Sequence, residues 1–330
     1  MNVDETSTAL AQFMSGQTGA PAEVRDLARL PGGFSYETWR FQATWRNKTE
    51  TKNEPLILRK APRGGLLEPY DASKEFRVLK AIEGSAIPAP RAYWCDPTGA
   101  VLGTSFYIME FVAGDVPLPW DNSLPAEERP EIHRQFTDAL AGLHTIDWES
   151  RGLSFLGVPS DTGDSAALEL DRCEELLDRI KMRPHPVIRE VISFLRARRP
   201  RSQRLSLVHD DYRMGNFVWR EGRIMAVLDW ERAFIGDPMA DVAFTRMGLG
   251  GWCSIDGEMA RRYTEKSGIQ IDEDRVKYWM LLEGLKANLV GLTGLKAFAE
   301  GRTSDLRLVQ IGRGALAGIA GQAAAIGLGQ

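Results

Sequence analysis

The sequence predicts an α+β fold of two lobes, a small antiparallel-sheet lobe followed by a larger, mostly helical lobe. Short apolar segments with alternating polar residues, separated by glycine and proline turns, recur up to about residue 112, which is typical of antiparallel strands. Helical spacing of apolar residues dominates from residue 126 onward. We therefore expect an N-lobe at 1–112 and a C-lobe at 113–330, with a ligand cleft between them, because pockets gather at domain interfaces.

Composition and charge exclude several classes of protein. The 330 residues are 43% hydrophobic, enough for a sizeable core, while the net charge of −4 provides no general attraction to nucleic acid. The first residues are polar and unlike a secretory signal, and no run of 18 apolar residues could span a membrane. The three cysteines lack the spacing of a zinc site or a disulfide framework: Cys95, Cys173 and Cys253. We expect a cytoplasmic protein whose partners include neither nucleic acid nor membranes.

The N-lobe is expected to begin with a helix and a glycine turn. A short helix that starts near Thr6 or Ser7 is predicted within residues 8–30. The following segment, LPGGFSYETW, predicts a strand, a glycine turn and a second strand. Its glycines have two interpretations, a hairpin turn that needs a positive φ or a loop whose backbone N–H groups approach phosphates. The motif described below favours the second interpretation, with three candidate phosphate-binding residues: Gly33, Phe34 and Ser35.

Apolar spacing predicts the other elements of both lobes. The N-lobe continues with strands at 56–60, 92–95 and 105–112 and a helix at 71–83. The strand at 56–60 ends in Arg59 and Lys60, whose side chains point to opposite faces because side chains alternate along a strand. In the C-lobe, helices are expected at 128–146, 165–182, 185–199, 256–266, 273–298 and 303–326. The last of these lies in a tail rich in alanine and glycine.

One polar cluster stands apart from this pattern. An apolar run ends abruptly at His209-Asp210-Asp211, and Asn216 follows five residues after Asp211. Two short strands, 217–220 and 224–228, are joined by a turn at Glu221-Gly222, a plausible hairpin. The hairpin returns Asp229 to the neighbourhood of Asp211 and Asn216. Two carboxylates and an amide oxygen form a hard, oxygen-only cluster of the kind that Mg²⁺ with a phosphate partner prefers.

The same stretch resembles a known family. The pattern H-x-D-x-x-x-x-N, then D-W-E and G-D-P-x-x-D, is similar to the aminoglycoside phosphotransferase/choline kinase family, a small-molecule branch of the protein-kinase-like fold. The resemblance implies that Asp211 is the catalytic base and that Asn216 and Asp229 hold Mg²⁺. It also implies two supporting residues, His209 in the loop itself and Asp241 as a buried acceptor for the backbone amides of the loop.

The resemblance extends to the N-lobe, where it implies an ATP site. The family pattern V-A-I-K overlays on LILR at 56–59, which places Arg59 at the position of the phosphate-binding lysine, with Lys60 as the alternative. Glu75, early in the next helix, would pair with this cation. The segment YIMEFVAG resembles the hinge that meets the adenine edge, which adds three candidate nucleotide-binding residues: Met109, Glu110 and Val112.

The activity that the resemblance implies is transfer of the γ-phosphoryl group of ATP to a hydroxyl of a small molecule. The form HDDYRMGN also looks like the kinase domains fused to some acyl-CoA dehydrogenases, so a hydroxyacyl-CoA-like metabolite and an antibiotic both remain candidate acceptors. Acids and bases balance in the C-terminal helices, which argues against a polycationic acceptor. Asp210 stands where the family usually has glycine, and Glu231 is either a contact near the metal or part of a salt bridge.

Two other interpretations compete with the small-molecule kinase. One is a catalytically silent kinase-like module that binds a nucleotide or metabolite, which the intact Asp211, Asn216 and Asp229 argue against. The other is a protein kinase. Only six residues separate Asp229 from Gly236, too few for an activation segment that could hold a protein substrate.

Overall fold

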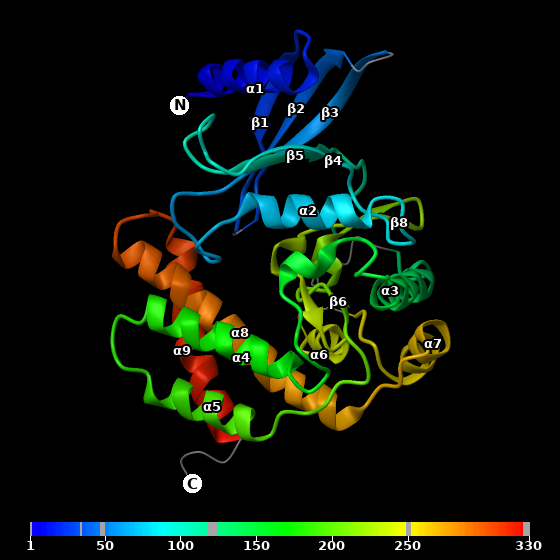
Figure 1. Cartoon of the computed structure of the whole chain (residues 1–330), viewed down its shortest axis with the longest axis vertical. Coiled ribbons are helices and arrows are strands. Elements are labelled where there is room, and N and C mark those ends of the chain that lie inside the picture. The colour runs from blue at the N-terminus through cyan, green and yellow to red at the C-terminus, as the bar shows by residue number, and fades with distance from the viewer. Residues whose placement is uncertain (1, 34, 47–49, 118–124, 249–251, 326–330) are drawn as a thin grey trace.

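The structure, a computed structural model, confirms the α+β architecture, with a five-stranded antiparallel sheet at one end and a helical lobe at the other (Figure 1). It describes residues 2–33, 35–46, 50–117, 125–248 and 252–325. Phe34, one of the predicted loop residues, lies outside the described residues. Within the described part of the chain, no helix is both long enough and apolar enough to cross a membrane.

The N-lobe is a sheet with a helix on each face. Its strand order is β1-β2-β3-β5-β4, with all neighbours antiparallel. Helix α1 lies over the outer face and α2 lies on the side of the helical lobe (Figure 1). The bounds are α1 Val3–Thr18, β1 Glu23–Arg29, β2 Glu37–Arg46, β3 Thr51–Lys60, α2 Ala72–Ile82, β4 Ala92–Asp96 and β5 Phe106–Glu110.

The start of the chain differs from the prediction of a helix within 8–30. Helix α1 begins at Val3, because Asn2 and Glu5 form a reciprocal capping box, and it ends at Gly19, whose φ of 69° suits glycine. Residues 23–29 form strand β1 instead of helix. Only Leu27 of this strand is buried, so the hydrophobic alternation that would have indicated a strand is absent from its sequence.

The C-lobe consists of helices around two small two-stranded sheets. Strands β6 and β9 pair with each other, and β7 and β8 form the predicted hairpin. The prediction missed β9, a three-residue strand too short to show periodicity. The bounds are α3 Arg129–His144, α4 Ser165–Ile180, α5 Pro186–Ala197, β6 Ser206–Val208, β7 Phe217–Arg220, β8 Arg223–Val227, β9 Phe234–Gly236, α6 Met239–Arg246, α7 Gly257–Ser267, α8 Glu273–Ala299 and α9 Leu306–Ala325, with short 3₁₀ turns at Leu153–Leu156, Met214–Asn216 and Trp230–Arg232.

The glycines of the alanine- and glycine-rich tail let α9 approach α8 closely. A Cβ atom at Gly312 would lie 2.6 Å from Cβ of Leu295 and 3.0 Å from the carbonyl oxygen of Gly291. A Cβ at Gly291 would lie 2.7 Å from Cβ of Ala315. The two helices therefore pack through positions without side chains, and α8 in turn contacts α4 and α6, the helices next to the polar cluster (Figure 1).

This close approach predicts opposite effects for two neighbouring glycines. Gly312→Ala should destabilise the fold by about 1–3 kcal/mol, because the added methyl group overpacks the helix crossing. Gly314 faces open space, so Gly314→Ala should stabilise the helix by about 0.5–1 kcal/mol. Urea unfolding followed by circular dichroism measures both changes, and equal effects of the two substitutions would contradict the packing argument.

Candidate active site

The loop after β6 is held by one buried carboxylate. Oδ2 of Asp241 accepts a hydrogen bond from the backbone N–H of His209, and Oδ1 accepts one from the N–H of Asp210, both at 2.8 Å. The ring Nε2 of His144 lies 3.0 Å from Oδ2 of the same carboxylate, and its Nδ1 lies 2.7 Å from the hydroxyl of Tyr263. His144, Asp241 and His209 are all fully buried. The structure thus places Asp241 where the predicted supporting role requires it.

His209 connects this loop to the end of the hairpin. Its Nε2 donates to the carbonyl oxygen of Leu228 at 2.8 Å, and its Nδ1 accepts from the N–H of Asp211 at 3.2 Å. The backbone N–H of Leu228 donates in turn to the carbonyl of Asn216 at 2.8 Å. Together these bonds fix Asp211 and Asn216 relative to Asp229, the residue after Leu228.

Asp211 and Asn216 are in direct contact. Nδ2 of Asn216 donates to Oδ2 of Asp211 at 2.7 Å and to the Asp211 carbonyl at 2.9 Å. Nε of Arg213 lies 3.0 Å from the other carboxylate oxygen, Oδ1. The Asp211 carboxylate keeps about a fifth of its side chain exposed, so a ligand can reach it.

Arg59 is the cation of the cluster, and Lys60 points elsewhere. Nη2 of Arg59 lies 2.8 Å from Oδ1 of Asp229, 3.6 Å from Oε2 of Glu231 and 3.8 Å from Oε2 of Glu75. Burial lowers the pKa of Arg59, but the nearby carboxylates, Asp229 first, outweigh this effect and raise that pKa above its ordinary value. Lys60 lies on the other face of β3 and pairs with Glu37 at 3.3 Å. Of the two predicted cations, only Arg59 meets the predicted partner Glu75.

Glu75 is buried beside Arg59, and Glu231 is partly buried there. Oε1 of Glu75 accepts the backbone N–H of Trp230 at 3.0 Å, which ties helix α2 to the segment after Asp229. Burial raises the pKa of Glu75, and it raises the pKa of Glu231 to about 8. Glu231 is therefore part of the Arg59 ion-pair cluster, one of the two roles that the sequence left open.

The side chains of Asn216 and Asp229 fit a magnesium ion. Oδ1 of Asn216 is buried and has no hydrogen-bond partner, because the amide nitrogen is already turned toward Asp211. The described part of the chain holds no group of three or more His, Cys, Asp or Glu side chains that could bind a metal by themselves. Mg²⁺ commonly binds one or two protein side chains and completes its shell with water and phosphate oxygens, which this pair allows.

The backbone amides of the predicted hinge differ in their hydrogen bonding. The N–H of Glu110 donates to the carbonyl of Arg91 at 2.8 Å, and the N–H of Phe111 donates to the carbonyl of Pro55 at 3.3 Å. The N–H of Val112 makes no hydrogen bond with any residue that the structure describes. Met109 is buried behind this segment. Among these three amides, only that of Val112 lacks a hydrogen-bond partner within the described residues.

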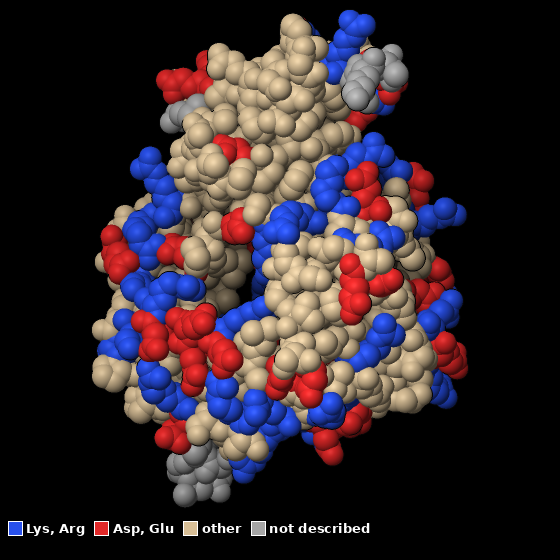
Figure 2. Space-filling view, viewed as in Figure 1, with Lys and Arg blue, Asp and Glu red and all other residues tan. Residues whose placement is uncertain are grey.

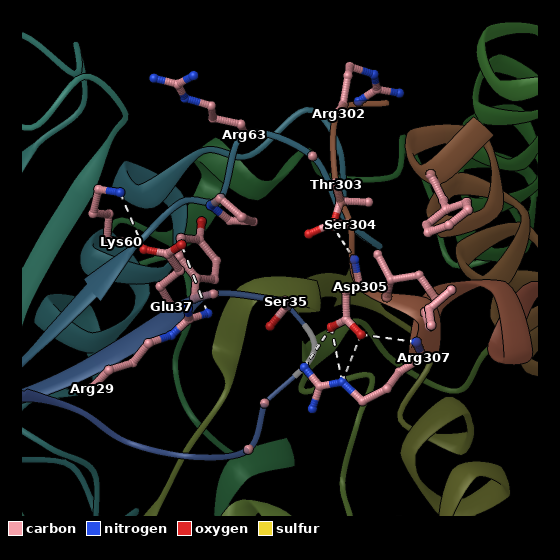
Figure 3. A pocket seen from close by; sticks show the side chains of 18 of the residues that line it. Arg29, Ser35, Glu37, Lys60, Arg63, Arg302, Thr303, Ser304, Asp305 and Arg307 are labelled. Carbon is pink, nitrogen blue, oxygen red and sulfur yellow. Dashed lines mark hydrogen bonds and ion pairs between the residues drawn. The ribbon is translucent and has the colours of Figure 1, made fainter. Parts of the chain in front are cut away.

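The glycine loop borders a cavity of about 1350 Å³ that separates it from the connection between α8 and α9. Gly33 and Ser35 line it on one side and residues 301–308 on the other (Figure 3). Its cations are mostly matched with acids, since Lys60 pairs with Glu37 and Arg307 with Asp305. Asp211, Asn216 and Asp229 are not among its lining residues.

The charge cluster around Asp210 is not among the features predicted from the sequence. This buried residue has a φ of 67°, and its carboxylate lies 2.5 Å from Nζ of Lys286 and 3.0 Å from Nε of Arg232. Glu283 bridges the same two cations, at 3.0 Å and 3.1 Å. Burial raises the pKa of Asp210, but Arg232 and Lys286 outweigh it and hold that pKa below its ordinary value. Aspartate tolerates the left-handed conformation better than most residues, and here the side chain gains two ion pairs.

Comparison with known proteins places this arrangement in a family. The model of the phosphotransferase enzyme family matches residues 26–279, which include Arg59, Glu75, Asp211, Asn216 and Asp229. The chain belongs to the phosphotransferase enzyme family. This phosphotransferase is 32% identical over 244 residues to mouse acyl-CoA dehydrogenase family member 10, covering 72% of the chain and 22% of that protein. It is 27% identical over 289 residues to human acyl-CoA dehydrogenase family member 11, covering 85% and 35%. The phosphotransferase thus spans only a fifth to about a third of these relatives.

Solved structures share the fold of this phosphotransferase. A candidate aminoglycoside phosphotransferase from Ralstonia eutropha JMP134 aligns with a TM-score of 0.67 and 23% identity, over 94% of this chain and 95% of that one. A thermostable mutant of aminoglycoside phosphotransferase APH(4)-Ia, solved with AMP-PNP and hygromycin B, aligns with a TM-score of 0.60 and 18% identity, over 98% of this chain and 100% of that one. A Plasmodium vivax ethanolamine kinase aligns with a TM-score of 0.58 and 12% identity, over 89% of this chain and 81% of that one. These matches confirm the kinase-like fold, and the family model confirms the predicted family.

Proposed function

We propose that the phosphotransferase transfers the γ-phosphoryl group of ATP to a hydroxyl group of a small molecule. The observation that supports this most directly is the contact between Asp211 and Asn216, side by side with the Arg59–Asp229 ion pair. A base, an oxygen ligand pair and a cation thus lie together where the two lobes meet. Among the proteins of similar fold, the aminoglycoside phosphotransferase was solved with AMP-PNP and hygromycin B, and another is named an ethanolamine kinase.

In the proposed reaction, each group of the cluster has one task. Asp211 orients the acceptor hydroxyl and takes its proton, which then passes to water. The acceptor oxygen bonds to the γ-phosphorus, the bond from that phosphorus to the bridging oxygen breaks, and ADP leaves. Arg59, positioned by Glu75, would bind the α- and β-phosphates in a bidentate manner. Mg²⁺ on Asn216 and Asp229 would offset negative charge on the phosphates.

Thermal unfolding with and without Mg²⁺–ATP tests the nucleotide site. ATP at about 100 times its Kd should add about 2.7 kcal/mol to the free energy of unfolding, or several degrees in Tm. Asp229→Ala should remove the Mg²⁺-dependent part of this shift, and GTP in parallel reports the base preference. An equal shift in wild type and Asp229→Ala would overturn the metal assignment. No shift with either nucleotide in the wild type would overturn the kinase proposal itself.

A further inference from the structure

A second cavity reaches the catalytic loop from the side of the helical lobe. It encloses about 300 Å³ between residues 66–71, helix α4 and helix α8. Asp210, next to the proposed base Asp211, lines it, and so do Glu231 and Arg232, which follow Asp229. On the face shown in Figure 2, the surface is hollowed between the lobes and charges of both signs are interspersed over the helical lobe. This cavity is therefore in the right place for an acceptor molecule.

Part of the cavity wall is apolar. Aliphatic side chains come from the N-lobe loop, from α4 and from α8: Leu66, Leu67, Leu176, Leu289 and Val290. Cys173 and two tyrosines, Tyr36 and Tyr70, add further weakly polar surface. Such a wall suits a carbon skeleton of a few methylene groups, which gains about 0.8 kcal/mol for each buried CH₂ group.

Four of the five acidic side chains that line this cavity already lie within ion-pair distance of a cation. Glu169 pairs with Arg172 and with Nζ of Lys286, the latter at 2.9 Å, and Asp210 pairs with Lys286 and Arg232. The remaining three acids have partners as well: Glu68 pairs with Arg302, Asp71 caps α2 through the N–H of Ser73, and Glu231 lies 3.6 Å from Arg59. Of these five carboxylates, only Asp71, exposed at the start of α2, has no cationic partner among the described residues.

Lys74 is the exception among the cations. It lies in the first turn of α2 and lines the cavity, partly buried, and no carboxylate that the structure describes forms an ion pair with it. Arg179, the other lining cation without a carboxylate, is exposed and bonds to the carbonyl of Glu68 at 3.2 Å. Burial, followed by the nearby Arg172, lowers the pKa of Lys74 to about 8, as expected for an ammonium group short of negative charge.

We propose that this cavity binds the acceptor and that Lys74 selects a hydroxyl compound carrying an anionic group, a carboxylate or a phosphate, on a short apolar skeleton. The proposal rests on the proposed kinase function. Four of the five lining acids already have a cationic partner, so a cationic amino alcohol or aminoglycoside finds little counter-charge in the cavity. An anion, by contrast, completes the ion pairing of Lys74.

The test compares ligands of equal length and different charge in the presence of Mg²⁺ and AMP-PNP. The probes are 6-hydroxyhexanoate, 6-hydroxyhexyl phosphate, 6-hydroxyhexanamide and 6-amino-1-hexanol, with Kd measured by calorimetry. At least one anion should bind the wild type about 10- to 100-fold more tightly than the amide, as for a hydrogen bond to a charged group, and the amine should bind most weakly. The two anions distinguish a carboxylate from a phosphate ligand.

Three variants separate recognition from folding. Lys74→Met should bring the anions down to the affinity of the amide and leave the amide itself unchanged, while Lys74→Arg should restore the preference. Lys80→Met, on the same helix with an exposed Lys80–Glu83 pair, is the matched control and should have no effect. Tighter binding of the amine, no binding of either anion at millimolar concentration, or an equal loss for all four probes in Lys74→Met would overturn the proposal.

A pH profile adds a second readout. The groups that face Lys74 are Arg172 and Glu169 of α4, Asp210 of the catalytic loop and Lys286 of α8. Binding of the anion to the wild type should weaken as pH rises above about 8 and Lys74 loses its proton. Lys74→Arg should not show this weakening, because arginine stays charged. The Mg²⁺–ATP shift in Tm should persist in all Lys74 variants, so a failure of this proposal is distinguishable from a failure of the kinase function.

Discussion

Asp211→Asn should lower kcat by about 10²- to 10⁴-fold with a suitable hydroxyl acceptor, the usual contribution of general-base catalysis. Asparagine keeps the size of the side chain and one oxygen, which can still accept from Nδ2 of Asn216, although the contact with Arg213 is lost. It cannot take the proton of the acceptor hydroxyl. Because the Asn216 and Asp229 oxygens are unchanged, Mg²⁺–ATP should raise Tm as much as in the wild type. Coupled-assay kinetics and thermal unfolding measure the two effects.

The control for Asp211→Asn is the same substitution at an aspartate that does not contact Asp211, Asn216 or Asp229. Asp256 precedes α7, is exposed and makes no capping hydrogen bond, so Asp256→Asn should leave both kcat and Tm nearly unchanged. Full turnover by Asp211→Asn would remove Asp211 from the role of base. A loss of the Mg²⁺–ATP shift in Asp211→Asn would mean that the residue serves the nucleotide site instead.

The catalytic side of the site could be predicted because its residues are close in sequence. Asp211, Asn216 and Asp229 belong to one loop and one hairpin, and hairpin geometry alone returns the end of β8 to the start of β7. His209 and Asp241 came from the resemblance, and the structure adds the reason for their positions, which is a set of hydrogen bonds to two backbone amides and one carbonyl.

The remaining parts depend on contacts between distant segments, which sequence patterns do not contain. Asp210 meets Lys286 across 76 positions, and Trp230 meets Glu75 across 155. The sequence shows that Asp210 adds a negative charge, but it does not show which cations neutralise it. These are Lys286 on α8 and Arg232, which follows the β7–β8 hairpin. Strand β1 is absent from the prediction for a different reason: it is an edge strand of the sheet and buries only Leu27, so its sequence shows no hydrophobic alternation.

Among the substitutions considered, replacing Arg59 should have the largest effect on stability. Arg59→Met should destabilise the fold by about 3–5 kcal/mol, because it leaves the buried carboxylate of Glu75 and the partly buried carboxylates of Asp229 and Glu231 without their common cation. The same substitution should raise the Kd for Mg²⁺–ATP at least about tenfold, through the loss of charge-assisted hydrogen bonds to the phosphates. Urea unfolding and nucleotide titration measure the two changes.

Lys60→Met provides the matched comparison, since it removes the same charge one residue further along β3. The Lys60–Glu37 pair is about a quarter exposed on both sides, so its loss should cost no more than about 1 kcal/mol. Nucleotide affinity should stay within about twofold of the wild type, because Lys60 faces away from Asp229. If Lys60→Met weakened nucleotide binding more than Arg59→Met, the phosphates would have to lie in the cavity of the glycine loop, where Lys60 does point (Figure 3). The two single substitutions therefore decide which face of β3 carries the nucleotide.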